Sequence, residues 1–195
     1  MKKSKIILIV CVVALVAFLA LSAKVIDKGT EGQYTGEVAF DASASSSGDW
    51  DAVLQEITAN AVDIGAVDLA ALGDGKAVSL KGTVSEYVSK AAGKKNSITV
   101  VPEGYSGDAV FSVQLGSIYS GTAVRDAQTA KAFGDFTNQT EWSQYAKALN
   151  SKVDELVVAP LGIDEGIQGK TVTVVGAATA SGGEVTITPV AITIE

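Results

Sequence analysis

The sequence predicts an α+β domain, in which an antiparallel sheet is packed by one long amphipathic helix and is preceded by a membrane segment. Three observations lead to this fold class. Apolar residues recur at helical spacing from about Asn138 to Val158, and the clearest alternation lies at 109–115. Two strand-like segments, 170–179 and 184–194, end the sequence, and no βαβ unit is repeated before them.

The first 23 residues have the pattern of an export signal. Lys2, Lys3 and Lys5 precede 18 uncharged, mostly apolar residues from Ile6 to Ala23. The basic end of such a segment stays in the cytoplasm. We therefore expect the chain beyond this segment to lie on the extracytoplasmic face of the plasma membrane, in the periplasm or at the cell surface.

The length of this segment bears on whether it is cleaved. It exceeds the roughly 7–15 residues of a signal-peptide core and reaches the roughly 17–25 that span a bilayer, which favours a retained single-pass anchor. The small residues Ala20 and Ser22 also allow cleavage before Ala23. Cys11, the only cysteine, follows the bulky Val10 inside the apolar run, so we interpret it as a small apolar residue of the membrane segment.

Charge and composition exclude several classes of function. The chain carries 15 basic and 22 acidic residues, a net charge of −7, and the part after the three N-terminal lysines carries −10. Such an acidic domain repels phosphate backbones, so we expect no nucleic-acid partner. One cysteine and no histidine leave no disulfide within the chain, no cysteine zinc site and no iron–sulfur cluster, and we expect no cofactor. The missing histidine also removes the commonest general base, and we expect no enzyme activity.

The remaining chain divides into a linker and a domain. We expect a linker at 24–48 and an extracytoplasmic α+β domain at 49–195. Asp49 is positioned to cap a helix that begins near Trp50. Residues 77–92 are ambiguous: 77–80 can form a strand and 83–92 a short helix.

The C-terminal half contains the clearest strands. A strand is expected at 97–101, followed by a turn rich in proline and glycine and by the alternating strand 109–115. The two final segments form an antiparallel hairpin, and Pro189, which lacks an N–H, indicates an edge or a bulge in the last strand. The segment 169–176 before this hairpin is typical of small OB-like barrels, which is the other form the sheet can take.

The long helix should bury one face against the sheet. Its apolar stripe consists of Trp142, Tyr145, Ala146, Leu149, Val153, Leu156 and Val157. Trp50, Phe133 and Phe136 are likewise expected to pack in the core.

Four segments, taken in order, form a recognisable pattern. They are GTAVRDA at 121–127, FGDFTNQ at 133–139, the helix that follows, and IQGKTVTVVG with ITPV near the end. Together they resemble a bacterial family of predicted periplasmic lipoproteins of unknown function. The resemblance implies an envelope location and association with sugar uptake systems of the ABC type. The chain departs from the lipoprotein pattern because Cys11 has no convincing lipidation motif around it.

Residues 115–139, between the alternating strand and the long helix, contain the candidate site. Arg125 and Asp126 are its centre. A guanidinium here can bind an anionic or polyhydroxyl ligand, or the carboxylate of a partner, through a fork of two N–H groups. Alternatively, Arg125 pairs with an acid such as Asp135 and holds the loop on the sheet.

Three further residues complete the candidate binding site. Gly121 allows a turn or the close approach of another backbone. Asn138 and Glu141 have the spacing of a helix capping box, which explains Asn138 without a ligand. Gln139 has no such structural explanation.

These observations favour a non-enzymatic, envelope-exposed binding or accessory module. Its partners would be the membrane, through the N-terminal segment, and a transporter component or a small polar ligand. Two alternatives remain open: a secreted hydrolase that uses two carboxylates, and a purely structural envelope protein. The carboxylates show no calcium-loop spacing, and we expect no metal site.

Overall fold

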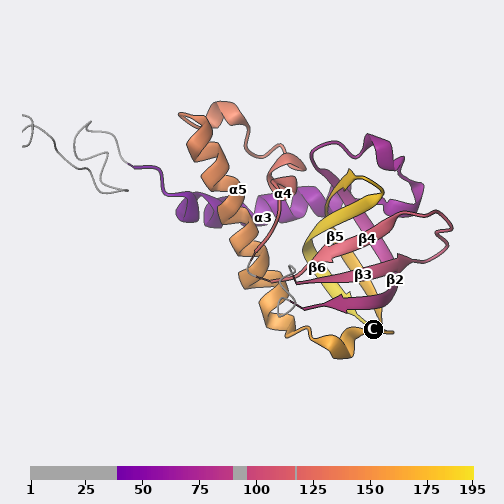
Figure 1. Cartoon of the computed structure of the whole chain (residues 1–195). Coiled ribbons are helices and arrows are strands. Elements are labelled where there is room, and N and C mark those ends of the chain that lie inside the picture. The colour runs from indigo at the N-terminus through magenta and orange to yellow at the C-terminus, as the bar shows by residue number, and fades with distance from the viewer. Residues whose placement is uncertain (1–38, 90–95, 117) are drawn as a thin grey trace, which may run out of the picture. The chain divides into compact units, whose positions relative to one another are not determined.

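A computed structural model describes residues 39–89, 96–116 and 118–195 (Figure 1). The expected membrane segment and most of the expected linker lie outside the described residues. Within the described part, none of the helices has the length and apolar character needed to span a bilayer. Residues 41–195 form a single unit, which contains every element discussed below.

The core of this unit is a closed sheet. In the described part of the chain it contains β1 (Val62–Asp63), β2 (Lys76–Val88), β3 (Ser97–Pro102), β4 (Val110–Gln114), β5 (Thr171–Ser181) and β6 (Glu184–Ile194). The strand order is β1-β2-β3-β4-β6-β5, and β5 pairs back onto β2, so the last five strands form a barrel. This confirms the OB-like form of the predicted sheet.

The sheet is mixed rather than antiparallel. Residues 110–113 of β4 run parallel to 184–187 of β6, and β1 runs parallel to β2. A parallel pair needs a long crossover connection. Here the connection from β4 to β6 consists of the helical region after β4 followed by β5. The predicted long helix therefore provides most of the length that the parallel pairing of β4 with β6 needs.

The strand β2 changes neighbours along its length. Its first part, 76–83, pairs with β5, and its second part, 82–88, pairs with β3. Gly82 lies at the crossing point, where an added Cβ would be 2.2 Å from the carbonyl oxygen of Val101. The strand at 77–80 is confirmed and continues to Val88, so residues 83–88 do not form the short helix that the sequence also allowed.

The closing hairpin agrees with prediction. β5 and β6 pair antiparallel from Ser181–Glu184 onward, across two glycines with positive φ. Gly176 pairs with Pro189 and Val175 pairs with Ala191, which leaves one extra residue in β6. Of the edge or bulge expected at Pro189, the structure shows the bulge, and its extra residue is the adjacent Val190.

The first helix begins earlier than predicted. α3 spans Ala42–Asn60, and the side chain of Asp41 accepts a hydrogen bond from the backbone N of Ala44 at 2.9 Å. The predicted start near Trp50 with Asp49 as cap was wrong, because Asp41 caps the helix and the small residues after it continue the helical backbone. Ser46 is fully buried, whereas Ser43, Ala44, Ser47 and Gly48 are exposed.

The long helix packs beside α3 and the barrel (Figure 1). α5 spans Gln139–Val153 and continues as a π-helical turn, Asp154–Val158, and a 3₁₀ turn, Ala159–Leu161. A π turn has more residues than an α turn, so the apolar stripe shifts. Leu156 is 49% exposed and Val158 is buried, so the prediction that Leu156 continues the stripe was wrong.

The apolar core lies inside the barrel and between the barrel and the helices. The largest fully buried side chains are Tyr145, Phe111, Ile57, Ile64, Leu80, Ile98, Leu149, Ile187, Val53, Val78, Val84 and Val100. Trp50 is buried as predicted, whereas Trp142 is only half-buried.

Candidate functional site

In the described part of the predicted segment 115–139, two short helical turns lie between β4 and α5. They are α4 (Ala123–Asp126) and η4 (Phe133–Asp135). Gly121 precedes α4 with a φ of 77°, a conformation that favours glycine. Its carbonyl oxygen accepts a hydrogen bond from Asn150 Nδ2 of α5 at 3.1 Å, so the turn is attached to the long helix.

Arg125 and Asp126 form an ion pair with each other. Arg125 Nε and Nη2 donate to Asp126 Oδ1 at 2.8 and 2.6 Å, and Thr122 Oγ1 donates to Asp126 Oδ2. The two side chains are 14% and 18% exposed. The alternative in which Arg125 pairs with an acid is confirmed, but the acid is Asp126 and not Asp135, because the helical turn brings the neighbouring carboxylate into reach. Asp135 Oδ2 accepts instead from the backbone N of Ala132.

An aromatic cluster supports the guanidinium. The Arg125 guanidinium carbon lies 4.4 Å from the ring centroid of Trp142, which is a cation–π contact. Phe136 packs against Trp142 and Tyr145 with centroids 5.0 and 5.1 Å apart. Phe133 also touches Trp142 but is 52% exposed, so its prediction as a core residue was wrong. The Trp142 ring is thus held in place beneath Arg125.

Tyr145 links this cluster to α3. Its ring is fully buried, and its hydroxyl donates to Asp49 Oδ2 at 3.2 Å. Burial, together with the charge and the hydrogen bond of Asp49, raises the pKa of the Tyr145 hydroxyl. Lys131 Nζ lies 4.0 Å from Asp49 Oδ1. Asp49, predicted as a helix cap, therefore joins two helices and the loop after α4.

The loop after α4 is fixed by two side chains that the sequence did not single out. Gln128 is 6% exposed, and its amide donates to the carbonyl oxygens of Arg125 and Lys131 at 2.9 and 2.8 Å. From α3, Glu56 accepts the backbone N of Thr129 at 2.8 Å and that of Ala130 at 3.1 Å. Neither residue has a sequence motif around it, so only the fold reveals these roles.

A groove of about 450 Å³ lies beside the ion pair. Its lining includes the charged residues Asp74, Arg125, Asp126 and Lys131 and the ring of Trp142. The other lining residues are Leu72, Gly73, Gly75, Gln128, Thr129 and Ala132. The wall at 73–75 lies close to α4, because an added Cβ on Gly75 would be 2.6 Å from the carbonyl oxygen of Ala123. The volume lies in the range of small-molecule sites.

The other predicted site residues are outside this groove. Asn138 Oδ1 accepts the backbone N of Glu141 at 3.0 Å and caps α5, as predicted. Glu141 Oε2 accepts the backbone N of Thr137 at 2.8 Å. Gln139 is exposed in the first turn of α5. Of the predicted residues, the groove is lined by Arg125 and Asp126 and not by Gly121, Asn138 or Gln139.

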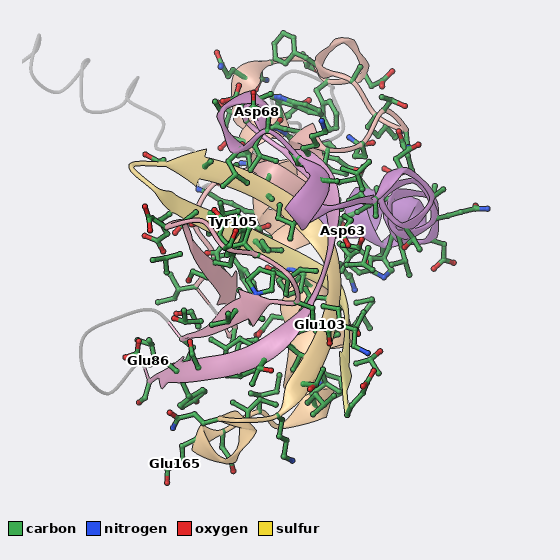
Figure 2. All side chains as sticks on the ribbon, turned by 90° about the vertical axis from the view of Figure 1, so that its right-hand side faces the viewer. Asp63, Asp68, Glu86, Glu103, Tyr105 and Glu165 are labelled. Atoms are coloured by element: carbon green, nitrogen blue, oxygen red, sulfur yellow. The ribbon has the colours of Figure 1, made fainter. Side chains whose placement is uncertain are left out.

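The remaining carboxylates have local structural roles or are dispersed. Asp63, Asp68 and Asp164 each accept a backbone N–H two residues on, at 2.7, 3.0 and 2.8 Å, and cap 3₁₀ turns. Figure 2 shows Asp68 near one end of the barrel and Glu165 near the other. Among the described residues, no three acidic, histidine or cysteine side chains come together in a way that would hold a metal ion.

A family model described as a predicted periplasmic lipoprotein (DUF2291) matches residues 11–193. The chain belongs to this family. It is therefore an extracytoplasmic, membrane-associated protein, as the sequence predicted. No curated protein matches the chain.

A solved structure supports the fold. The crystal structure of an OB-fold protein from Thermotoga maritima superposes with a TM-score of 0.55 at 17% sequence identity. The match covers 80% of this chain and 99% of that one. At this identity the likeness establishes the OB fold alone.

Proposed function

We propose that this family member is a non-catalytic binding module, held at the extracytoplasmic membrane face by its N-terminal segment, with its ligand in the groove beside Arg125. One observation carries the proposal. The Arg125–Asp126 pair, supported by Trp142, lines a groove of about 450 Å³ that chain segments far apart in sequence build together.

The chemistry of the groove suits a small polar ligand. A guanidinium has five N–H donors, and Asp126 accepts from two of the Arg125 nitrogens. The remaining donors are suited to a carboxylate or to neighbouring hydroxyls of a ligand. Lys131 and Asp74 add one charge of each sign to the lining. A monosaccharide or a sugar acid matches this mixture of donors and acceptors.

The hydrogen bonds of Asp126 argue against a carboxylate-pair hydrolase in this groove. Both of its oxygens already accept hydrogen bonds, one from Arg125 and one from Thr122. A catalytic acid or base must have an oxygen free to reach the substrate, and both oxygens of Asp126 are held by neighbouring side chains. Binding without catalysis therefore suits the groove better than hydrolysis.

The proposed partner is a component of a sugar or solute ABC uptake system. The resemblance noted in the sequence suggests it, and the extracytoplasmic, membrane-associated location supports it. A module of this kind would present a small solute close to the membrane, where an uptake system collects it.

The test is ligand binding by the full chain in detergent, measured by calorimetry against neutral pentoses and hexoses and against uronic acids. Arg125→Ala should abolish binding, and Arg125→Lys should weaken it, because lysine keeps the charge and loses the fork. Lys147→Ala, which removes an exposed cation on α5, is the matched control. A large drop in melting temperature with unchanged binding in Arg125→Ala would refute the ligand role of Arg125.

A further inference from the structure

A second groove, of about 480 Å³, lies on the outer face of the barrel. Most of its lining belongs to β3, β4 and β6, which are neighbours in the barrel (Figure 1). It shares no lining residue with the groove beside Arg125. Its lining is dominated by uncharged hydrogen-bonding side chains: Asn96, Ser97, Thr99, Ser112, Gln114, Ser120 and Thr186.

The strand register sets the hydroxyls of this groove in a row. Thr99 of β3 pairs with Ser112 of β4, and Ser112 pairs with Thr186 of β6. Neighbouring strands lie about 4.8 Å apart, so the row crosses about 10 Å of the sheet surface. The alternate residues on either side of each of these three point into the core, as the burial pattern shows.

The three hydroxyls of the row make no side-chain hydrogen bond to other described residues, and each residue is half-buried. Gln114, the next residue of β4 on this face after Ser112, differs because its side chain is hydrogen-bonded within the protein. Gln114 is 5% exposed, its Nε2 donates to Thr188 Oγ1 at 2.8 Å, and its Oε1 accepts from the backbone N of Ser120 at 2.7 Å. Gln114 therefore closes one end of the groove rigidly, while Val110, 48% exposed, provides an apolar surface at the other.

The charge of the groove lining indicates that it binds neutral rather than anionic ligands. Glu184 is the charged residue among the described lining, which contains no lysine or arginine, and Glu86 on β2 pairs with Thr99 at the edge of the row. Figure 2 shows Glu86 near the end of its strand. These carboxylates repel nucleic acids and other polyanions. Hydroxyls both donate and accept, which matches a ligand whose own polar groups are hydroxyls.

We propose that this outer face of β3, β4 and β6 binds a neutral glycan chain. The hydroxyl row would exchange hydrogen bonds with the sugar hydroxyls, and Val110 would pack against the apolar face of a sugar ring. This is a second site, independent of the ligand proposed for the groove beside Arg125.

The test uses the full chain in detergent on an array of neutral oligosaccharides, with acidic glycans and single-stranded DNA as anionic comparisons. We expect binding to neutral oligosaccharides alone. In Thr99→Val/Thr186→Val, two hydrogen-bonding groups are lost, and affinity should fall about tenfold or more. Thr173→Val/Thr193→Val is the matched control, because these paired threonines lie on β5 and β6 outside the groove, and it should leave binding unchanged.

Co-sedimentation with purified cell-wall sacculi distinguishes the source of the glycan. If the wild-type chain sediments with sacculi and Thr99→Val/Thr186→Val does not, the ligand is the glycan strand of the wall. If the chain binds the array but does not sediment with sacculi, the ligand is a free oligosaccharide. Absence of binding to every neutral glycan and to sacculi, preference for DNA, or unchanged affinity in Thr99→Val/Thr186→Val would each overturn the proposal. Arg125→Ala should leave glycan binding intact, so the two sites can fail separately.

Discussion

Replacing Glu56 with glutamine should reduce the free energy of unfolding by about 1–2 kcal/mol at neutral pH. Glu56 Oε1 accepts from Thr129 N and Oγ1 at 2.8 and 2.7 Å, and Oε2 accepts from Ala130 N at 3.1 Å. Glutamine keeps one acceptor oxygen and turns an NH₂ group toward a backbone donor. Hydrogen bonds to charged groups contribute about 1.5–3 kcal/mol when buried, and this half-buried position reduces that figure to about 1–2 kcal/mol.

The pH dependence of this loss gives a sharper test. Burial alone would raise the pKa of Glu56, but the hydrogen bonds from Thr129 and Ala130 outweigh burial and lower it from the ordinary value of 4.5. Because the folded-state pKa lies below the unfolded-state pKa, the stabilisation is complete above the unfolded value. It disappears as the pH falls through the folded value. The difference between wild type and Glu56→Gln should thus be constant near neutral pH and shrink below pH 4.5.

Urea unfolding of the full chain, followed by tryptophan fluorescence at several pH values, measures both quantities. Glu165→Gln is the control, because Glu165 is exposed in a turn far from this loop, and it should change stability by less than about 0.5 kcal/mol. A loss in Glu56→Gln that stays the same at acidic pH would show that the stabilisation does not come from the ionised carboxylate.

Two other predictions concern the barrel and the anchor. Gly82→Ala should destabilise the chain by about 2–4 kcal/mol in thermal melts, because an added Cβ would lie 2.2 Å from a carbonyl oxygen of β3. Gly134→Ala, which has open space, is its control, and a loss in Gly82→Ala below about 1 kcal/mol would argue against so close an approach. Mass spectrometry of the membrane fraction should find the chain intact from Met1, since the apolar segment is long enough to span a bilayer. A chain starting at Ala23, or diacylated at Cys11, would contradict a retained anchor.

The elements that were predicted correctly are those whose residue pattern lies within one continuous stretch of sequence. The hairpin of β5 and β6 combines alternation with a glycine turn, and Pro189 indicated its bulge because a missing N–H acts locally. The beginning of α3 was misplaced because residues 42–48 carry no apolar periodicity. The π turn after Val153 moved Leu156 into solvent, and nothing in its residues distinguishes it from an α turn.

Contacts between segments that are distant in the chain could not be predicted from the sequence. The pairing of β2 with β5 and the parallel closure of β4 on β6 depend on the whole chain folding back. At the candidate site, the sequence indicated Arg125 and Asp126 but not that they pair, because it did not predict the helical turn that joins them. Gln128 and Glu56 gave no signal, since a single polar residue on a loop or a helix face has many possible partners.

The groove beside Arg125 is the proposed binding site for a small polar solute. The most direct measurement is calorimetric titration of the full chain, and of Arg125→Ala and Lys147→Ala, with neutral monosaccharides and uronic acids, accompanied by a melting curve for each variant. We expect saturable sugar binding by wild type and Lys147→Ala and none by Arg125→Ala, which should still melt cooperatively. Equal binding by all three proteins, or no sugar bound by any of them, would contradict it.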